Sequence, residues 1–341
     1  MMKRICLIFL ATLCLTAALS ASANAQCSYT VSKKTWTLTA DCTVTSSFVI
    51  PNGITLDGAG HTIKAIDPAG DHFKGGVVTN GGATANVTNL KVTTSGLAEA
   101  CDDGADRLRG ILFDGASGSI TNNQVTNINQ NQGAVLSGCQ EGNGIEARNF
   151  GASPTTIRVV IDGNTISGYQ KTGIVANGNT DATITDNTVT GAGPNIYIAQ
   201  NGIQVGFGAT GMVKGNNVSG NSYTGPEAFN TSSGGILIFG DGSELCVGVQ
   251  VLKNTLTGND VGVFAAQFDD TSDTTPPSSM TNLKIVNNVI DKGNAGNPFY
   301  TAGVSDEGNN DKIIANTITG YATPVDADTS FTIRPKAHAN K

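Results

Sequence analysis

The segment CDDGADRLRG (Cys101–Gly110) gathers ionisable side chains in a chain that is otherwise poor in them. It carries three aspartates and two arginines, whereas charged residues make up 14% of the whole sequence. Clustered carboxylates are oxygen ligands of the kind that Ca²⁺ prefers, so Asp102, Asp103 and Asp106 are candidate calcium ligands. The same charges can instead pair with one another on an exposed loop, where such pairs contribute little.

A second set of charged groups lies further along the chain and is also suited to chemistry. Its members are Asp114, Glu146 and Arg148, joined by Arg107 and Lys171. Removing the proton next to a uronate carboxylate needs a base and a cation that neutralises the carboxylate. Hydrolysing a glycosidic bond needs two carboxyl groups, for which Glu146 and Asp114 are the obvious pair. These five residues are the candidate catalytic groups.

A repeat brings these distant residues together. The pattern [Ile/Val]-x-x-Asn-x-[Ile/Val/Leu] occurs seven times, and a Gly followed by Ile or Val recurs once per unit. A recurring unit of this length indicates a solenoid, and the short runs alternate apolar with polar residues, which predicts strands. The seven asparagines are Asn123, Asn164, Asn187, Asn216, Asn254, Asn288 and Asn316.

Each repeated asparagine is expected to make a tight turn between two strands. We expect it to take the left-handed backbone conformation, which Asn tolerates better than any residue except Gly. Stacked coil upon coil, the amides are expected to donate to and accept from one another as a ladder. The flanking Ile and Val side chains then point into the core.

These repeats resemble the right-handed parallel β-helix of the pectin-lyase-like superfamily. The stretch SFVIPNGITLDGAGHTI (Ser47–Ile63) is similar to its opening coils, and VTNLKV (Val87–Val92) is a variant repeat. The resemblance implies an all-β, single-stranded solenoid with a stacked Asn ladder, from about Thr43 to Thr323. It leaves the activity open, because this superfamily includes lyases, hydrolases, epimerases and non-catalytic proteins.

In β-helices of this type the Gly-Ile strand usually lines the substrate groove. Alternation turns the residues one and three places after each Ile outward, on coils that lie about 4.8 Å apart. Polar groups there suit sugar hydroxyls and flat rings suit a sugar face. Beside the charged candidates, the predicted substrate-binding residues are Asn177, Gln204, Phe239 and Phe264.

The net charge constrains the partner. It is −7 for the whole chain, and removing Lys3 and Arg4 with a signal peptide leaves 18 basic against 27 acidic residues, a net charge of −9. This balance argues against a nucleic-acid partner, which favours a basic face. An anionic polysaccharide remains possible if a Ca²⁺ ion bridges acid to acid.

The cysteines and the first residues indicate export. Lys3 and Arg4, a short apolar run and the sequence Ala23-Asn24-Ala25 predict a signal peptide cleaved after Ala25, and hence a secreted or periplasmic protein without membrane insertion. An exported chain usually oxidises its cysteines. We expect Cys27 to pair with Cys42 in an N-terminal cap, and Cys101 with Cys139 on groove loops of adjacent coils, leaving Cys246 free and buried.

The predicted organisation is a signal peptide (1–25), an N-terminal cap (26–42), a parallel β-helix (43–325) and a C-terminal tail (326–341). Two functions fit it. One is a polysaccharide lyase or glycoside hydrolase, acting on a glycan in the groove. The other is a non-catalytic β-helix that binds a glycan or another surface, as an adhesin or structural protein does. The resemblance in fold favours the first, whereas the absence of the signatures of polygalacturonases, pectate lyases and alginate epimerases favours the second.

Overall fold

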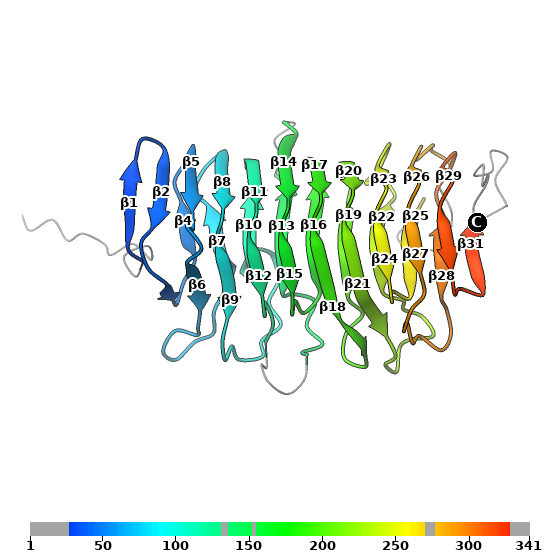
Figure 1. Cartoon of the computed structure of the whole chain (residues 1–341), viewed down its shortest axis with the longest axis horizontal. Helices are drawn as coiled ribbons and strands as arrows, with labels where there is room; N and C mark the ends of the chain where they lie inside the picture. Colours follow the sequence, from blue (N-terminus) through cyan, green and yellow to red (C-terminus); the bar gives the residue numbers. More distant parts are fainter. Residues whose placement is uncertain (1–26, 131–135, 152–154, 270–276, 328–341) are drawn as a thin grey trace, which may run out of the picture.

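A computed structural model describes residues 27–130, 136–151, 155–269 and 277–327. The chain forms an elongated stack of coils, with the described ends at opposite ends of the stack (Figure 1). Each coil contributes one strand to each of three parallel sheets, as the sequence predicts. The predicted signal peptide and residues 328–341 lie outside the described residues. In the described part, no helix is long and apolar enough to cross a membrane.

The first sheet contains the Gly-Ile strands and has ten members. Register is kept along the stack, so that Ile111, Ile145 and Ile174 lie on successive coils and are fully buried. The recurring Gly before each Ile has a packing reason: a Cβ on Gly173 would collide with Val189 Cγ1. The strands are β4 (Phe48–Ile50), β7 (Gly76–Asn80), β10 (Arg109–Asp114), β13 (Asn143–Asn149), β16 (Thr172–Gly178), β19 (Asn201–Gly206), β22 (Gly234–Asp241), β25 (Val261–Phe268), β28 (Ala302–Asp306) and β31 (Thr323–Ala327).

The second sheet follows the first in every coil and has eleven strands. Its side chains alternate between the core and solvent, which is the period-2 signal of the sequence. The strands are β1 (Tyr29–Ser32), β2 (Thr35–Leu38), β5 (Ile54–Asp57), β8 (Thr84–Thr88), β11 (Ser117–Thr121), β14 (Ile157–Asp162), β17 (Thr180–Thr185), β20 (Thr210–Lys214), β23 (Gln250–Leu252), β26 (Lys284–Val286) and β29 (Lys312–Ile314).

The third sheet completes each coil and has ten strands, most of them three or four residues long. The segments that leave this sheet for the next Gly-Ile strand are the groove-flanking loops. The strands are β3 (Cys42–Val44), β6 (Thr62–Ala65), β9 (Lys91–Thr94), β12 (Gln124–Thr126), β15 (Thr165–Ser167), β18 (Thr188–Asn195), β21 (Asn217–Tyr223), β24 (Thr255–Thr257), β27 (Val289–Asp291) and β30 (Thr317–Thr319).

The predicted Asn ladder is confirmed and joins the second sheet to the third. Asn187 Nδ2 donates to Asn216 Oδ1 at 2.9 Å, and the Asn187 backbone N–H donates to the same oxygen at 3.0 Å. Asn187 Nδ2 also donates to Ile161 O at 2.9 Å. The same pattern links all seven asparagines, which are 1–2% exposed. In the variant repeat, Leu90 stands in the ladder position, and its N–H donates to Asn123 Oδ1.

The expected conformation of the ladder asparagines is wrong. The residue before each asparagine takes the left-handed conformation, for example Asp186 with φ of 53° and Lys253 with φ of 55°. The asparagine itself is not in the left-handed conformation, and its side chain bonds to the next coil along the stack. The turn therefore separates two tasks: one residue reverses the backbone and the next one bonds from coil to coil.

The N-terminal cap is a hairpin rather than a coil. Strands β1 and β2 pair antiparallel, and β2 then pairs parallel with β5. The Tyr29 ring stacks on Trp36 with centroids 4.4 Å apart, and the predicted disulfide between Cys27 and Cys42 is present. At the other end, the predicted boundary at residue 325 falls within β31.

Candidate functional site

The outward rungs of the first sheet lie in the register that alternation predicts. Leu112, Glu146, Val175, Gln204, Leu237 and Phe264 form one row across six coils, and Asp114, Arg148, Asn177, Gly206 and Phe239 form the neighbouring row. The structure therefore brings together residues that are far apart in sequence. The predicted glycosidase pair and the predicted amide ligands share one face of the sheet.

This face is covered over part of its length. Glu146, Arg148 and Asn177 are only 3%, 9% and 8% exposed although they point away from the core. The segment Cys101–Arg109, here called the roof loop, contributes Gly104, Arg107 and Arg109 to a cleft of about 390 Å³ that extends over strands β10, β13, β16 and β19. Its ionisable lining residues are Arg107, Arg109, Glu146, Arg148 and Lys171.

Glu146 is the central carboxylate of the cleft, and its charge is already matched. Its Oε2 accepts from Arg109 Nε at 2.7 Å and from Asn143 Nδ2 at 2.8 Å. Arg148 NH1 lies 3.9 Å from Oε1. The Arg109 and Glu146 side chains are 2% and 4% exposed, so each would be an uncompensated buried charge without the other.

Arg148 is paired with Asp114 at the edge of the cleft. Arg148 NH2 donates to Asp114 Oδ2 at 2.8 Å, and its NH1 donates to Gly104 O of the roof loop at 3.3 Å. Asp114 itself is exposed. The guanidinium thus bridges the sheet and the roof loop, and two of the five predicted catalytic residues form one ion pair.

Lys171 lies beside these groups without a carboxylate among its described partners. Its Nζ donates to Ala199 O at 2.8 Å. Burial lowers the pKa of Lys171 to about 8. A lysine in this range is charged for most of its time at neutral pH and still supplies a neutral amine as pH rises.

Amides and rings form the remaining wall. Gln204 Nε2 donates to Asn177 Oδ1 at 3.1 Å, so the two predicted amide ligands contact each other. Phe239 packs edge-on against Phe207 with centroids 5.2 Å apart, and Phe207 against Phe150 at 6.0 Å. Phe150 and Phe207 line the cleft, whereas the predicted ligands Phe239 and Phe264 do not.

The sequence prediction missed these two rings for different reasons. Phe150 continues the outward parity of Glu146 and Arg148, so extending the alternation by one step finds it. Phe207, which follows Gly206, has a φ of 55°, and this left-handed conformation breaks the alternation of inward and outward side chains. A bulky residue in this conformation is uncommon, and nothing in the local pattern signals it.

A profile of the right-handed β-helix region matches residues 109–321. The chain belongs to the right-handed β-helix family. A search of curated proteins finds no match.

This β-helix is similar to three solved structures, all at low identity. They are the Dettilon tailspike protein gp208 (18% identity, TM-score 0.46), the A-module of the Azotobacter vinelandii mannuronan C-5 epimerase AlgE4 (14%, 0.40) and the catalytic unit of a GH87 α-1,3-glucanase from Streptomyces thermodiastaticus strain HF3-3 (14%, 0.36). The matches cover 89%, 90% and 90% of this chain, and 61%, 89% and 61% of the other chains.

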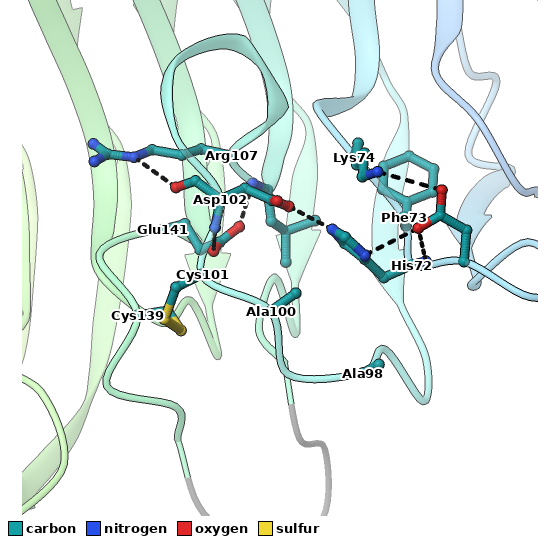
Figure 2. A network of polar contacts seen from close by, with 12 residues as sticks. His72, Phe73, Lys74, Ala98, Ala100, Cys101, Asp102, Arg107, Cys139 and Glu141 are labelled. Atoms are coloured by element: carbon teal, nitrogen blue, oxygen red, sulfur yellow. Dashed lines mark hydrogen bonds and ion pairs between the residues drawn. A yellow bond between two sulfur atoms is a disulfide. The ribbon is translucent and has the colours of Figure 1, made fainter.

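The aspartates predicted to bind calcium do not converge in this β-helix. Asp102 Oδ2 lies 2.8 Å from His72 Nε2 (Figure 2), and Asp103 pairs with Arg107 at 3.3 Å. Asp106 is exposed. Among the described residues, no three His, Cys, Asp or Glu side chains form a metal-binding group. Asp102 therefore ties the roof loop to His72 of the preceding coil, and Asp103 pairs within the loop.

A larger hollow of about 670 Å³ lies at the Asn-turn corner of the β-helix. Asp57 and Lys91 are the only ionisable side chains in its lining, and much of the rest is turn residues. Size therefore does not identify the site. The smaller cleft is the one that gathers charged and aromatic groups.

Proposed function

We propose that this β-helix is an exported protein that binds an acidic polysaccharide in the cleft over the first sheet, and that it cleaves the chain as a uronate lyase. One observation carries the proposal. Four cationic side chains line the cleft against one carboxylate, in a chain whose net charge is −7. A local excess of positive charge on an acidic protein favours an anionic ligand.

The four cations differ in what they are free to do. Arg109 and Arg148 are matched by Glu146 and Asp114, so they contribute mainly to the shape of the cleft. Arg107 is partly exposed, and its one ion pair among the described residues, with the exposed Asp103 at 3.3 Å, contributes little; its Nε also donates to Asp102 O at 3.2 Å. Arg107 and Lys171 are therefore the groups that a ligand carboxylate would engage.

The lyase step assigns different roles to these two residues. Arg107 neutralises the uronate carboxylate, which makes the neighbouring C–H more acidic. The neutral amine of Lys171 takes that proton, the electron pair forms a carbon–carbon double bond, and the glycosidic C–O bond breaks. The leaving oxygen takes a proton from water. Because the pKa of Lys171 is about 8, this step should accelerate as pH rises toward that value.

Hydrolysis is a weaker candidate. A glycosidase needs one carboxyl group that carries a proton to the leaving oxygen. Glu146 and Asp114 are each already engaged by a guanidinium group, at 2.7 and 2.8 Å, so neither carboxyl group is left free to face a leaving oxygen. Non-catalytic binding remains the second candidate, since the paired groups form a preorganised polar surface without further chemistry.

The aromatic wall suits a sugar chain in either case. Phe150 is 55% exposed and Phe207 extends the row toward Phe239. A pyranose ring has an apolar face that can pack on an exposed aromatic ring, while its hydroxyls reach Asn177 and Gln204. Export is proposed on the signal-like first 25 residues and on two disulfides, which persist in oxidising compartments.

The test is incubation of the purified protein with polygalacturonate, alginate and a neutral glucan. Absorbance from an unsaturated uronate product is expected with an acidic polymer, and it should fall at least about tenfold in Lys171→Met. The matched control is Lys214→Met, an exposed lysine on β20. Retention of an acidic polymer without product would instead establish the binder, and new reducing ends without absorbance would establish a hydrolase.

A further inference from the structure

The roof loop has almost no hydrophobic packing of its own. Its short 3₁₀ turn, Gly104–Asp106, buries no residue, and buried side chains begin only at Leu108 and Arg109. A segment with few buried contacts opens at low free-energy cost unless other ties hold it. Its position over the cleft therefore depends on polar and covalent contacts.

Those contacts come largely from one short segment, Cys139–Glu141. The disulfide joins Cys139 to Cys101, as the sequence predicts. Glu141 is 1% exposed, and its two carboxylate oxygens accept from opposite ends of the roof loop. Oε1 accepts from Asp102 N at 2.9 Å, and Oε2 accepts from Leu108 N at 2.8 Å (Figure 2). One buried carboxylate thus holds the loop closed on itself.

The roof loop in turn sets the geometry of the cleft arginines. Gly104 O accepts from Arg109 NH2 at 3.0 Å and from Arg148 NH1 at 3.3 Å. Arg107 O accepts from Arg109 NH1 at 2.6 Å. A displaced roof loop would remove these acceptors and carry Arg107 away from the cleft. The strands beneath the roof loop would keep their hydrophobic core packing.

We propose that Glu141 is a positioning residue and that, with the Cys101–Cys139 disulfide, it clamps the roof loop over the cleft, so that affinity for an acidic glycan depends on this clamp. The inference rests on the proposed function. It also makes the site sensitive to reduction, because reducing the disulfide removes the covalent half of the clamp. His72 adds a third contact from the preceding coil through Asp102 (Figure 2).

The clamp is tested first without any glycan. Glu141→Gln keeps the size of the side chain but turns an NH₂ group toward one of the two backbone donors. Amide hydrogen exchange at Asp102 and Leu108 should accelerate about tenfold or more, because a hydrogen bond to a charged group is lost. The thermal midpoint should stay unchanged. Glu227→Gln, at an exposed glutamate between β21 and β22, is the matched control and should leave both exchange rates unchanged.

The consequence for the site is tested with an oligogalacturonate. Its dissociation constant should rise about tenfold in Glu141→Gln and in the double variant Cys101→Ser/Cys139→Ser, but not in the control. Unchanged exchange in Glu141→Gln would overturn the clamp, and faster exchange with unchanged affinity would overturn its effect on the site. If the parent protein retains no acidic glycan, the proposed function fails, and the exchange rates alone decide the clamp.

Discussion

The two corners of each coil that flank the third sheet are built in opposite ways. The Asn-turn corner repeats one residue type through seven coils, and each amide meets its neighbour at 2.9–3.0 Å. The groove corner repeats much less: its loops differ in length, a single Asn221–Asn259 pair at 2.8 Å imitates the ladder, and contacts such as Arg109 with Glu146 occur once among the described residues. Stability that is shared equally by all coils comes from the first corner. The second corner concentrates unique residues above one part of the stack.

A buried polar group in this β-helix is stabilising only when a hydrogen-bonding partner is supplied to it. Ladder amides receive that partner by repetition. The groove corner must supply it individually, with a disulfide, a buried carboxylate and two arginine pairs. A repeat makes the scaffold rigid, and departures from the repeat make a site.

The largest expected effect breaks the ladder at its centre. Asn187→Leu removes the acceptor of two Asn164 donors, each at 2.9 Å, and leaves Asn216 Oδ1 and Ile161 O without the Asn187 Nδ2 donor. We expect a loss of about 4 kcal/mol in the free energy of unfolding, from several unpaired buried groups. Urea unfolding measures it, with Thr188→Ser on the exposed face as the control. A loss under about 1 kcal/mol would show that the ladder is not a major source of stability.

A second prediction concerns a corner where repetition supplies no partner. Asp306 and Asp311 are fully buried, and the Oδ2 atom of each has no hydrogen-bond partner among the described residues. Burial, together with the neighbouring carboxyl of Asp311, raises the pKa of Asp306 well above its usual range. The stability tied to this proton is present at low pH and is lost as pH rises through the folded-state pKa.

Asp306→Asn should remove this pH dependence. The amide keeps the acceptor for Gly308 N and gains a donor for Asp311 without needing a proton. We expect a gain of about 2 kcal/mol at pH 8 and little change near pH 4, measured by urea unfolding at both values. Asp326→Asn, at an exposed position on β31, serves as the control. A stability difference between variant and parent that is the same at both pH values would contradict the interpretation.

Substituting Lys171 should change stability by less than substituting Asp306, and the difference from the parent should decrease rather than increase as pH rises. Its pKa is about 8 in the folded state against 10.5 for an ordinary lysine, so the unfolded chain binds more protons between these values and stability rises with pH there. Lys171→Met should therefore be more stable than the parent by about 1–2 kcal/mol at pH 7. The difference should shrink between pH 8 and 10. A constant difference across this range would mean that Lys171 titrates normally.

The smallest prediction separates the two tasks of the Asn turn. Lys253 precedes Asn254 and holds φ of 55°, a conformation that Gly adopts without cost. Lys253→Gly should gain about 0.5 kcal/mol, whereas Lys214→Gly, on strand β20, should lose a similar amount. Chemical denaturation of the two variants measures both values. If both variants gained stability, or both lost it, the turn conformation would not be what determines the sign of the stability change.

The features that the sequence predicts correctly follow from the two-residue alternation of its strands and from the recurrence of its asparagine repeat. Alternation placed Glu146, Arg148, Asn177 and Gln204 on one outward face, and the repeat placed seven asparagines in one ladder, because strand parity and coil stacking leave one solution. The positions of Cys101 and Cys139 on loops of adjacent coils, and of Cys27 and Cys42 in the N-terminal cap, were sufficient for both disulfides.

The remaining part depends on loops, whose conformations have no period. The sequence by itself determined the solenoid, its core, its ladder and the face on which the site lies. Only the tertiary structure decided that Glu146 is buried against Arg109, that the left-handed residue precedes each asparagine, and that Phe207 turns into the cleft. These outcomes depend on where the roof loop and its neighbours settle over the sheet, and that is fixed by contacts between segments of different coils rather than by any pattern within one.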